Sequence, residues 1–502
     1  MNEINNKIVF KNTIYPNKKC YLDERQMELL ALISFVGFVS GYDDLQKLWY
    51  LLQPVNCLYQ HSNKQISNST INKWCKRGFL LHKTKVSQHH AIFTVNRKGK
   101  YFLKQHHLIS DDDISIRNIN EHNILLNHLI INVLYKATQY FLNNYPTEYQ
   151  ALVNHHQDNQ NAFFFINYVM KNNNHLISND EKFQYQMPVF VHNIDVRSYN
   201  QQLGLDIYSQ SFNLIKPDAL ISFRNLRLYF ELDNLTETNQ TLLEKVKTYI
   251  QYAHLLPDRQ MKLFICFNDG SIKNSKVTTR HVPHLRMANL MKLILKDKMI
   301  LNKQSMYIYQ AYQKTTNLQI FLSPISDTWV DVCDCMLGNQ NINLKNTVDI
   351  WNNCHQQVKL NVITKQKADN FGFQVQSYLA KFGIVNTAHV SQSFEVFLGQ
   401  EHLIDSAFVM FFAYQQAIQK DRPAPCFVFP KRSIINNQSK NVAIISLQAT
   451  VKLNKYRFNE KNKYQHHFVG ILQSDNLKDN HNNLISCITN VNYEKLLKLS
   501  IK

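Results

Sequence analysis

The stretch KPDALISF (residues 216–223), followed after a short turn by LYFELDN (residues 228–234), decides the fold of the centre of the chain. Two apolar runs separated by the polar residues 224–227 predict a pair of antiparallel strands. Further strand patterns at 185–192 and 262–267, with helical spacing at 238–254, extend this pair into a sheet that carries packed helices.

The same hairpin predicts a cluster of carboxylates. Side chains alternate along a strand, so Glu231 and Asp233 share one face. Asp218 begins the partner strand, and a hairpin of this length brings all three side chains together. Clustered carboxylates repel one another unless a cation neutralises them, and oxygen ligands suit Mg²⁺ or Mn²⁺. The hairpin therefore predicts a metal site at Asp218, Glu231 and Asp233. Pro217-Asp218 also fits a common turn opener before a strand, and Glu231 or Asp233 taken alone fits a solvated strand edge; these alternatives stay open.

The helix after the hairpin contributes one further candidate. Its apolar positions form a stripe, and Lys245 lies at the border of that stripe, where a long side chain can reach over the sheet edge. A divalent ion lowers the pKa of a water and neutralises charge on a phosphate, and an ammonium group steadies the oxyanion. We therefore expect Lys245 to assist phosphodiester hydrolysis. A lysine that only flanks a buried stripe is the alternative.

The N-terminal part has a different pattern. Asp23 and Gln26 form a capping-box-like helix start, a second helix fits 43–52, and a third begins near Ser67. Extended runs at 79–85 and 91–95 follow. Three helices and a β-hairpin predict a winged helix-turn-helix whose third helix enters a DNA groove. The predicted DNA-binding residues are Ser69, Thr70, Asn72, Lys73, Lys76, Arg77, Lys83 and Lys85. A solvated polar helix face is the alternative.

Length and charge limit the class of protein. The chain has 502 residues, which predicts two to four domains. We place a winged helix at 20–108, a nuclease-like domain at 115–338 and a C-terminal α/β domain of unassigned role at 341–502. Lys and Arg number 56 against 37 Asp and Glu, and the net charge of +19 favours a polyanionic partner, nucleic acid in particular.

Targeting signals are not evident in the sequence. The first twenty residues contain no apolar run of signal-peptide length, and the longest apolar stretch, 29–39, is too short to span a bilayer. We therefore expect a cytoplasmic protein with no membrane anchor. The sequence also has no GxxxxGK[ST] phosphate loop, which argues against an ATPase.

Several of these residues together resemble a known family. Pro217-Asp218, Glu231-x-Asp233, and Lys245 with Tyr249 resemble the replication-relaxation proteins of Gram-positive plasmids and integrative elements, as do His122 and Asn127 in the preceding helix. That family is similar to plasmid mobilisation relaxases built on the PD-(D/E)XK restriction-endonuclease-like fold. The resemblance covers about residues 20–270. It implies an α/β multidomain protein in which a winged helix precedes the nuclease-like core, followed here by the C-terminal α/β domain.

The resemblance implies two functions. One is a Mg²⁺- or Mn²⁺-dependent nickase or relaxase acting on double-stranded DNA at a plasmid transfer or replication origin, together with other plasmid-transfer or replication proteins. The other is a non-catalytic origin-binding regulator with a degenerate nuclease fold. The third signature position holds Asp233 where the nuclease superfamily has lysine. Lys245 is a migrated replacement, or the centre is inactive; both remain open.

Overall fold

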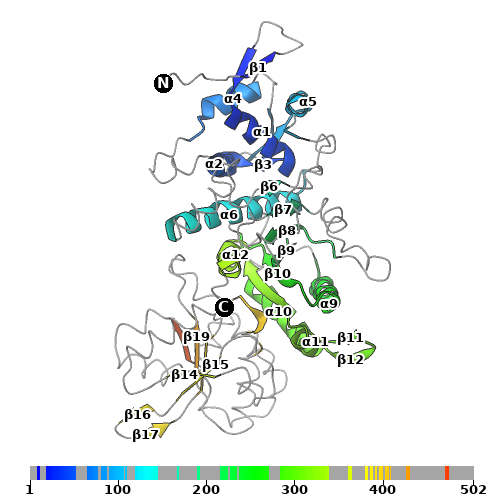
Figure 1. The fold of residues 1–502 in the computed structure, drawn as a ribbon, viewed down its shortest axis with the longest axis vertical. Helices are drawn as coiled ribbons and strands as arrows, with labels where there is room; N and C mark the ends of the chain where they lie inside the picture. The colour runs from blue at the N-terminus through cyan, green and yellow to red at the C-terminus, as the bar shows by residue number, and fades with distance from the viewer. Residues whose placement is uncertain are drawn as a thin grey trace. The chain divides into compact units, whose positions relative to one another are not determined.

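The structure is a computed structural model of the whole chain (Figure 1). It describes residues 8–11, 19–52, 65–76, 81–87, 90–106, 108–109, 119–144, 167–168, 189–192, 215–223, 226–234, 237–270, 283–337, 360–363, 379–382, 385–387, 390–392, 395–398, 402–405, 408, 426–429 and 470–473. The chain divides into two compact units. The first contains residues 1–234, 270–276 and 325–333, and the second contains residues 235–269, 277–324 and 334–502.

The first unit begins with the predicted helices. After the short strands β1 (Ile8–Lys11) and β2 (Lys19–Leu22), α1 (Glu24–Val36) starts where Asp23 accepts a hydrogen bond of 2.8 Å from the backbone N–H of Gln26. The predicted cap is therefore confirmed. The helix ends at Gly37, whose φ of 87° favours a residue without a side chain.

Two more helices and a small sheet complete the N-terminal part. α2 (Gly41–Leu51) and α4 (Asn68–Lys76) are followed by β4 (Leu81–Ser87), β5 (His90–Val95) and α5 (Arg97–Gln105). The two strands pair antiparallel, and β3 (Val39–Ser40) joins them in the order β3-β5-β4. Buried side chains from all three helices and from β5 form the core, among them Leu29, Ile33, Leu45, Leu48, Ile71, Trp74 and Phe93.

A long helix, α6 (Glu121–Asn144), packs against these elements. The buried side chain of Asn127 donates hydrogen bonds to the carbonyl oxygens of Val36 and Phe38, at 3.1 and 2.9 Å. The next residue, His128, contacts the buried carboxylate of Asp44 in α2 at 2.9 Å. Two elements far apart in sequence are therefore joined by polar bonds as well as by apolar packing.

The predicted hairpin of the centre is confirmed. β8 (Ala219–Phe223) and β9 (Leu226–Asp233) pair antiparallel, and β7 (Val189–His192) pairs antiparallel with β8 and parallel with β6 (Asn167–Tyr168). Every residue of β9 after Leu226 is buried. This continuous burial differs from the half-solvated edge that was left open for the strand.

The second unit pairs helices with parallel strands. Thr238 caps α9 (Asn239–Leu255), and β10 (Gln260–Phe267) runs parallel to β13 (Leu318–Pro324). α10 (Pro283–Lys296) packs on α9. The helix after β13, α12 (Thr328–Leu337), belongs mostly to the first unit. Between α10 and β13, β11 (Lys298–Leu301) and β12 (Gln304–Tyr307) form a hairpin. Its two turn residues, Asn302 and Lys303, have φ of 51° and 63°, as this tight turn requires.

The sequence pattern of residues 306–312 predicts a strand, and this prediction is wrong beyond its first two residues. β12 ends at Tyr307, where α11 (Ile308–Lys314) begins. The Gln310 side chain accepts the backbone N–H of Tyr307 and so satisfies the helix start. Ile308, Ala311 and Tyr312 are buried at helical spacing. Helix capping and a buried helical face outweigh the β-propensity of the tyrosines.

The C-terminal region has a sheet of its own, in the order β14-β15-β18-β19-β20, and a separate β16-β17 pair. Its strands are β14 (Leu360–Ile363), β15 (Leu379–Phe382), β16 (Val385–Thr387), β17 (Val390–Gln392), β18 (Glu395–Leu398), β19 (Cys426–Phe429) and β20 (Gly470–Gln473). The sequence pattern of this region predicts strands at 426–429 and 441–453 and helices near 365–382 and 406–420. The strand at 426–429 is confirmed, whereas the end of the helix predicted at 365–382 is strand β15. The strand predicted at 441–453 and most of the helix predicted at 406–420 lie outside the described residues.

Mixed α/β content is thus confirmed, and the domain boundaries remain predictions. Among the helices that the structure describes, none combines the length and the apolar character needed to cross a membrane.

Candidate functional site

The β8–β9 hairpin determines where the predicted carboxylates lie. Ala219 is the partner of Phe230, and the backbone N–H of Asp218 donates to the carbonyl oxygen of Phe230 at 2.9 Å. The paired register ends there, and Asp218 lies just before its first residue. Glu231 and Asp233 are two positions apart on β9, so their side chains project from the same face of that strand. The structure therefore brings Asp218 beside β9 at the end of the hairpin, with Glu231 and Asp233 on one face of β9.

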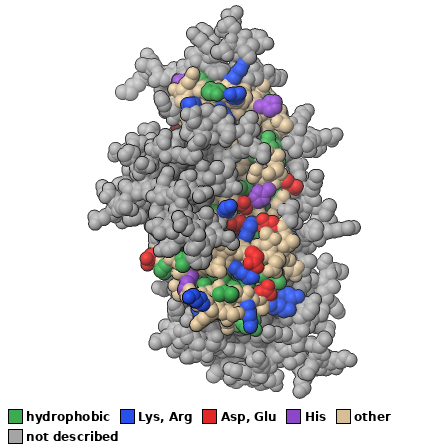
Figure 2. All heavy atoms as spheres, turned by 90° about the vertical axis from the view of Figure 1, so that its right-hand side faces the viewer, with side chains coloured by type: hydrophobic (Ala, Val, Ile, Leu, Met, Phe, Trp, Pro, Cys, Tyr) green, Lys and Arg blue, Asp and Glu red, His purple; other side chains and the backbone are tan. Residues whose placement is uncertain are grey.

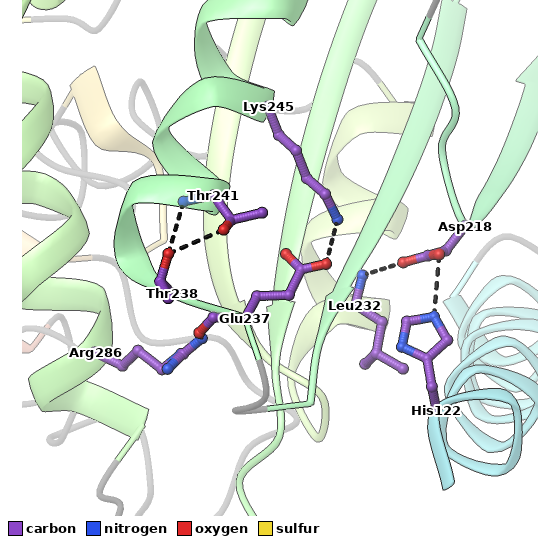
Figure 3. Close-up of polar contacts among 8 residues, drawn as sticks. All are labelled: His122, Asp218, Leu232, Glu237, Thr238, Thr241, Lys245 and Arg286. Atoms are coloured by element: carbon purple, nitrogen blue, oxygen red, sulfur yellow. Dashed lines mark hydrogen bonds and ion pairs between the residues drawn. The ribbon is translucent and has the colours of Figure 1, made fainter. Parts of the chain in front are cut away.

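Asp218 is held from two sides (Figure 3). One carboxylate oxygen accepts the backbone N–H of Leu232 at 2.7 Å, and the other lies 3.1 Å from Nε2 of His122, in the first turn of α6. The Asp218 side chain is 14% exposed and that of His122 is 34% exposed. A charged donor or acceptor strengthens such bonds, so Asp218 and His122 form a pre-positioned pair at the edge of the buried strand.

Glu231 and Asp233 are much more deeply buried, at 2% and 0% exposure. A buried carboxylate is costly unless hydrogen bonds or an opposite charge compensate it. Within the parts of the chain that the structure describes, no group of three or more His, Cys, Asp or Glu side chains is arranged to hold a metal ion.

Lys245 has a partner in its own unit. Its ammonium group lies 2.9 Å from Oε1 of Glu237, which precedes α9, and Arg286 of α10 donates to the backbone carbonyl of Glu237 (Figure 3). Lys245 is partly exposed at the border of the buried stripe, as expected. Tyr249, one turn further along α9, is buried in the core.

The predicted DNA-reading face lies on α4. Ser69 and Lys73 are exposed and Asn72 is half-buried, whereas Ile71 and Trp74 point into the core. The helix start is well defined, because the Ser67 hydroxyl accepts the N–H of Thr70 at 3.1 Å and contacts the hydroxyls of Ser69 and Thr70. The Gln46 side chain of α2 forms two hydrogen bonds with Ile66, the residue before Ser67. It accepts from the backbone N–H of Ile66 and donates to the Ile66 carbonyl oxygen.

The hairpin after α4 carries Lys83, whose ammonium group lies 3.2 Å from the hydroxyl of Tyr42. Lys76 ends α4 and Lys85 lies on β4, but their side chains, and Arg77 as a whole, lie outside the described residues. On the face drawn in Figure 2, basic and acidic side chains of described residues are intermixed. The net charge of the chain therefore does not mark a basic surface on this face, and α4 and its neighbours remain the candidate nucleic-acid surface.

Comparison with known proteins agrees with the family resemblance. The model of the replication-relaxation family matches residues 85–266. None of the curated proteins compared matches the chain, and none of the solved structures compared matches it.

The replication-relaxation match runs from β4 to β10 and includes α6, the β8–β9 hairpin and Lys245. The match agrees with the family resemblance over this segment, and the likeness to nuclease-fold relaxases stays a prediction. Of the residues that bring the site together, sequence reasoning left His122 out of the catalytic set. The available signal was its place in the family-like pattern at the start of α6.

Proposed function

We propose that this chain binds duplex DNA in the replication or relaxation of a mobile genetic element, and that α1, α2, α4 and the β4–β5 hairpin act as a winged helix-turn-helix. The observation that carries the proposal is the arrangement of α4, which buries Ile71 and Trp74 and offers Ser69, Asn72 and Lys73 outward beside a hairpin bearing Lys83. Lysines and hydroxyls reach phosphates, and asparagine reads base edges. The replication-relaxation match supplies the biological context.

The test is equilibrium binding of the full chain to duplex DNA from the replicon that encodes it, with competitor DNA and a series of salt concentrations. Lys73→Ala is expected to weaken binding to all sequences and to lower the salt slope by about 1. Lys303→Ala, on the exposed turn of β11–β12, is the matched control and should leave both unchanged. Equal loss in both variants, or no selective site in the replicon, would contradict the proposal.

A second function, DNA nicking at the β8–β9 hairpin, is favoured by one observation. Asp218 lies beside β9 at the end of the hairpin, and His122 and the N–H of Leu232 hold the Asp218 carboxylate. Carboxylate oxygens such as those of Asp218, Glu231 and Asp233 are ligands that suit Mg²⁺ or Mn²⁺. When bound, such an ion supplies neutralisation of the charge that grows on a phosphate.

In this second function the protein groups have separate tasks. Asp218 and Glu231 would hold the cation, and His122, which contacts Asp218, would orient that carboxylate and exchange a proton with water or the leaving oxygen. Lys245 is the predicted assisting cation, and to act it must leave its ion pair with Glu237.

Supercoiled plasmid carrying the replicon, incubated with the protein and Mg²⁺ or Mn²⁺, should be converted to the open circle. Asp218→Asn and Glu231→Gln should abolish conversion but retain DNA binding. Binding that EDTA and both substitutions leave intact, without any nicking by the wild type, would instead establish a non-catalytic DNA-binding role.

A further inference from the structure

Tyr42, at the start of α2, lies between two of the predicted DNA-contacting side chains. Its hydroxyl is 3.0 Å from Oδ1 of Asn72 on α4 and 3.2 Å from Nζ of Lys83 on β4. Its ring packs edge-on against Phe93 of β5 with centroids 4.9 Å apart, and the Lys83 ammonium lies 5.0 Å from the Tyr42 ring centroid. One side chain therefore joins α2, α4 and the hairpin.

The hydrogen-bonding chemistry of Lys83, Tyr42 and Asn72 fixes which group donates and which accepts in each bond. A lysine ammonium only donates hydrogen bonds, so the Tyr42 oxygen accepts from Lys83. The single proton of the Tyr42 hydroxyl is then left for Asn72, and only the carbonyl end of the Asn72 amide can accept it. Rotating the amide by half a turn would set its NH₂ group against a proton. The Lys83–Tyr42–Asn72 relay thus fixes which end of the amide faces inward.

We infer that Tyr42 is a specificity-positioning residue that makes Asn72 read guanine; this inference rests on the proposed DNA binding by α4. With its carbonyl turned to Tyr42, the half-buried Asn72 presents NH₂ donors outward. In the major groove guanine offers two acceptors, N7 and O6, whereas adenine offers one acceptor and one donor. The usual bidentate pairing of asparagine with adenine needs a side-chain carbonyl that faces the base. In the relay the Asn72 carbonyl faces Tyr42 instead.

The experiment is selection of binding sites from a randomised duplex pool by the full chain, followed by affinity measurements on single-base variants of the selected site. Wild type should favour guanine over adenine at one position by roughly five- to one-hundred-fold. Tyr42→Phe keeps the ring that packs on Phe93 and removes the hydroxyl, so this preference should fall to within about twofold while affinity for unrelated DNA is unchanged.

Two further variants make the test sharper. Asn72→Asp can still accept the Tyr42 proton but presents an acceptor outward, so the preferred base at that position should change to cytosine, whose N4 amino group donates. Tyr101→Phe removes a hydroxyl from an exposed tyrosine on α5 and should leave the preference of the wild type unchanged.

The outcomes separate the inference from the proposed function. If wild type selects a site but Tyr42→Phe retains the full guanine preference, or if Asn72→Asp leaves that position unaltered, the relay is overturned and DNA binding stands. If wild type selects no site at all, the proposed function falls and the inference falls with it. A guanine preference lost in Tyr42→Phe and converted in Asn72→Asp supports both.

Discussion

Replacing Asn127 by alanine removes the polar connection between α6 and the end of α1. The Asn127 side chain is 5% exposed, and its Nδ2 donates to the carbonyl oxygens of Val36 and Phe38 at 3.1 and 2.9 Å. The last carbonyls of a helix have no partner within that helix, so these bonds act as a cap supplied by another element.

The expected decrease in the free energy of unfolding follows from the loss of these two hydrogen bonds. Each hydrogen bond contributes about 1 kcal/mol, and a buried carbonyl left without its donor costs about 1–3 kcal/mol. The higher helix propensity of alanine offsets roughly 0.5 kcal/mol of this decrease. The free energy of unfolding of the N-terminal part should therefore fall by about 2–4 kcal/mol. Asn127→Asp should be at least as damaging, because a carboxylate cannot donate to either carbonyl.

Urea unfolding followed by tryptophan fluorescence measures this change, since Trp49 and Trp74 are both buried in the N-terminal core. Gln240→Ala is the matched control, because Gln240 is an exposed helical amide bonded only to the exposed Glu244 among the contacts described, and it should cost less than about 0.5 kcal/mol. If Asn127→Ala loses no more free energy of unfolding than this control, or if Asn127→Asp is as stable as the wild type, the two Asn127 bonds do not stabilise the end of α1.

Three further predictions concern single contacts. Gln46→Ala removes both bonds to Ile66 ahead of α4 and should lower the free energy of unfolding by roughly 1–3 kcal/mol, measured by urea titration; an unchanged midpoint would count against the clamp. Lys245→Met breaks a partly exposed ion pair and should change stability by only about 0–1 kcal/mol in the same assay, whereas a larger loss would refute this surface role. Burial is the main cause that raises the pKa of Asp405 from 3.8 to about 6, although the Tyr312 hydroxyl and Lys262 act to lower it. The folded state then binds the proton more tightly than the unfolded state, so the contribution of Asp405 to stability is greatest below pH 3.8 and declines as the pH rises through about 6. Asp405→Asn should remove that decline in urea midpoints measured from pH 4 to 7, and a decline of the same size in the variant would contradict the assignment.

Local signals account for the parts of the fold that the sequence predicted well. The Asp23 cap, the stop at Gly37 and the alternation of Glu231 and Asp233 each act within a few residues, and each is found in the structure. The outward face of α4 was likewise predictable, because the burial of Ile71 and Trp74 follows from helical spacing alone.

Contacts between distant residues were not predictable in this way. His122 and Asp218 are 96 positions apart, and Tyr42 lies 30 and 41 positions from Asn72 and Lys83. No periodicity relates such pairs, since their meeting depends on how helices and strands pack. Lys245 illustrates the same limit: its border position on α9 was correct, but spacing could not reveal its ion pair with Glu237.

The position of α6 connects the two proposed activities physically. His122, in its first turn, contacts Asp218, and Asn127 and His128, about one and a half turns further on, bond to the end of α1 and to Asp44 of α2. One helix therefore carries the contacts to Asp218, to the end of α1 and to Asp44 of α2 within its first two turns. The stability lost in Asn127→Ala would then be felt by the packing of α6 as a whole, because both ends of this stretch belong to the same helix.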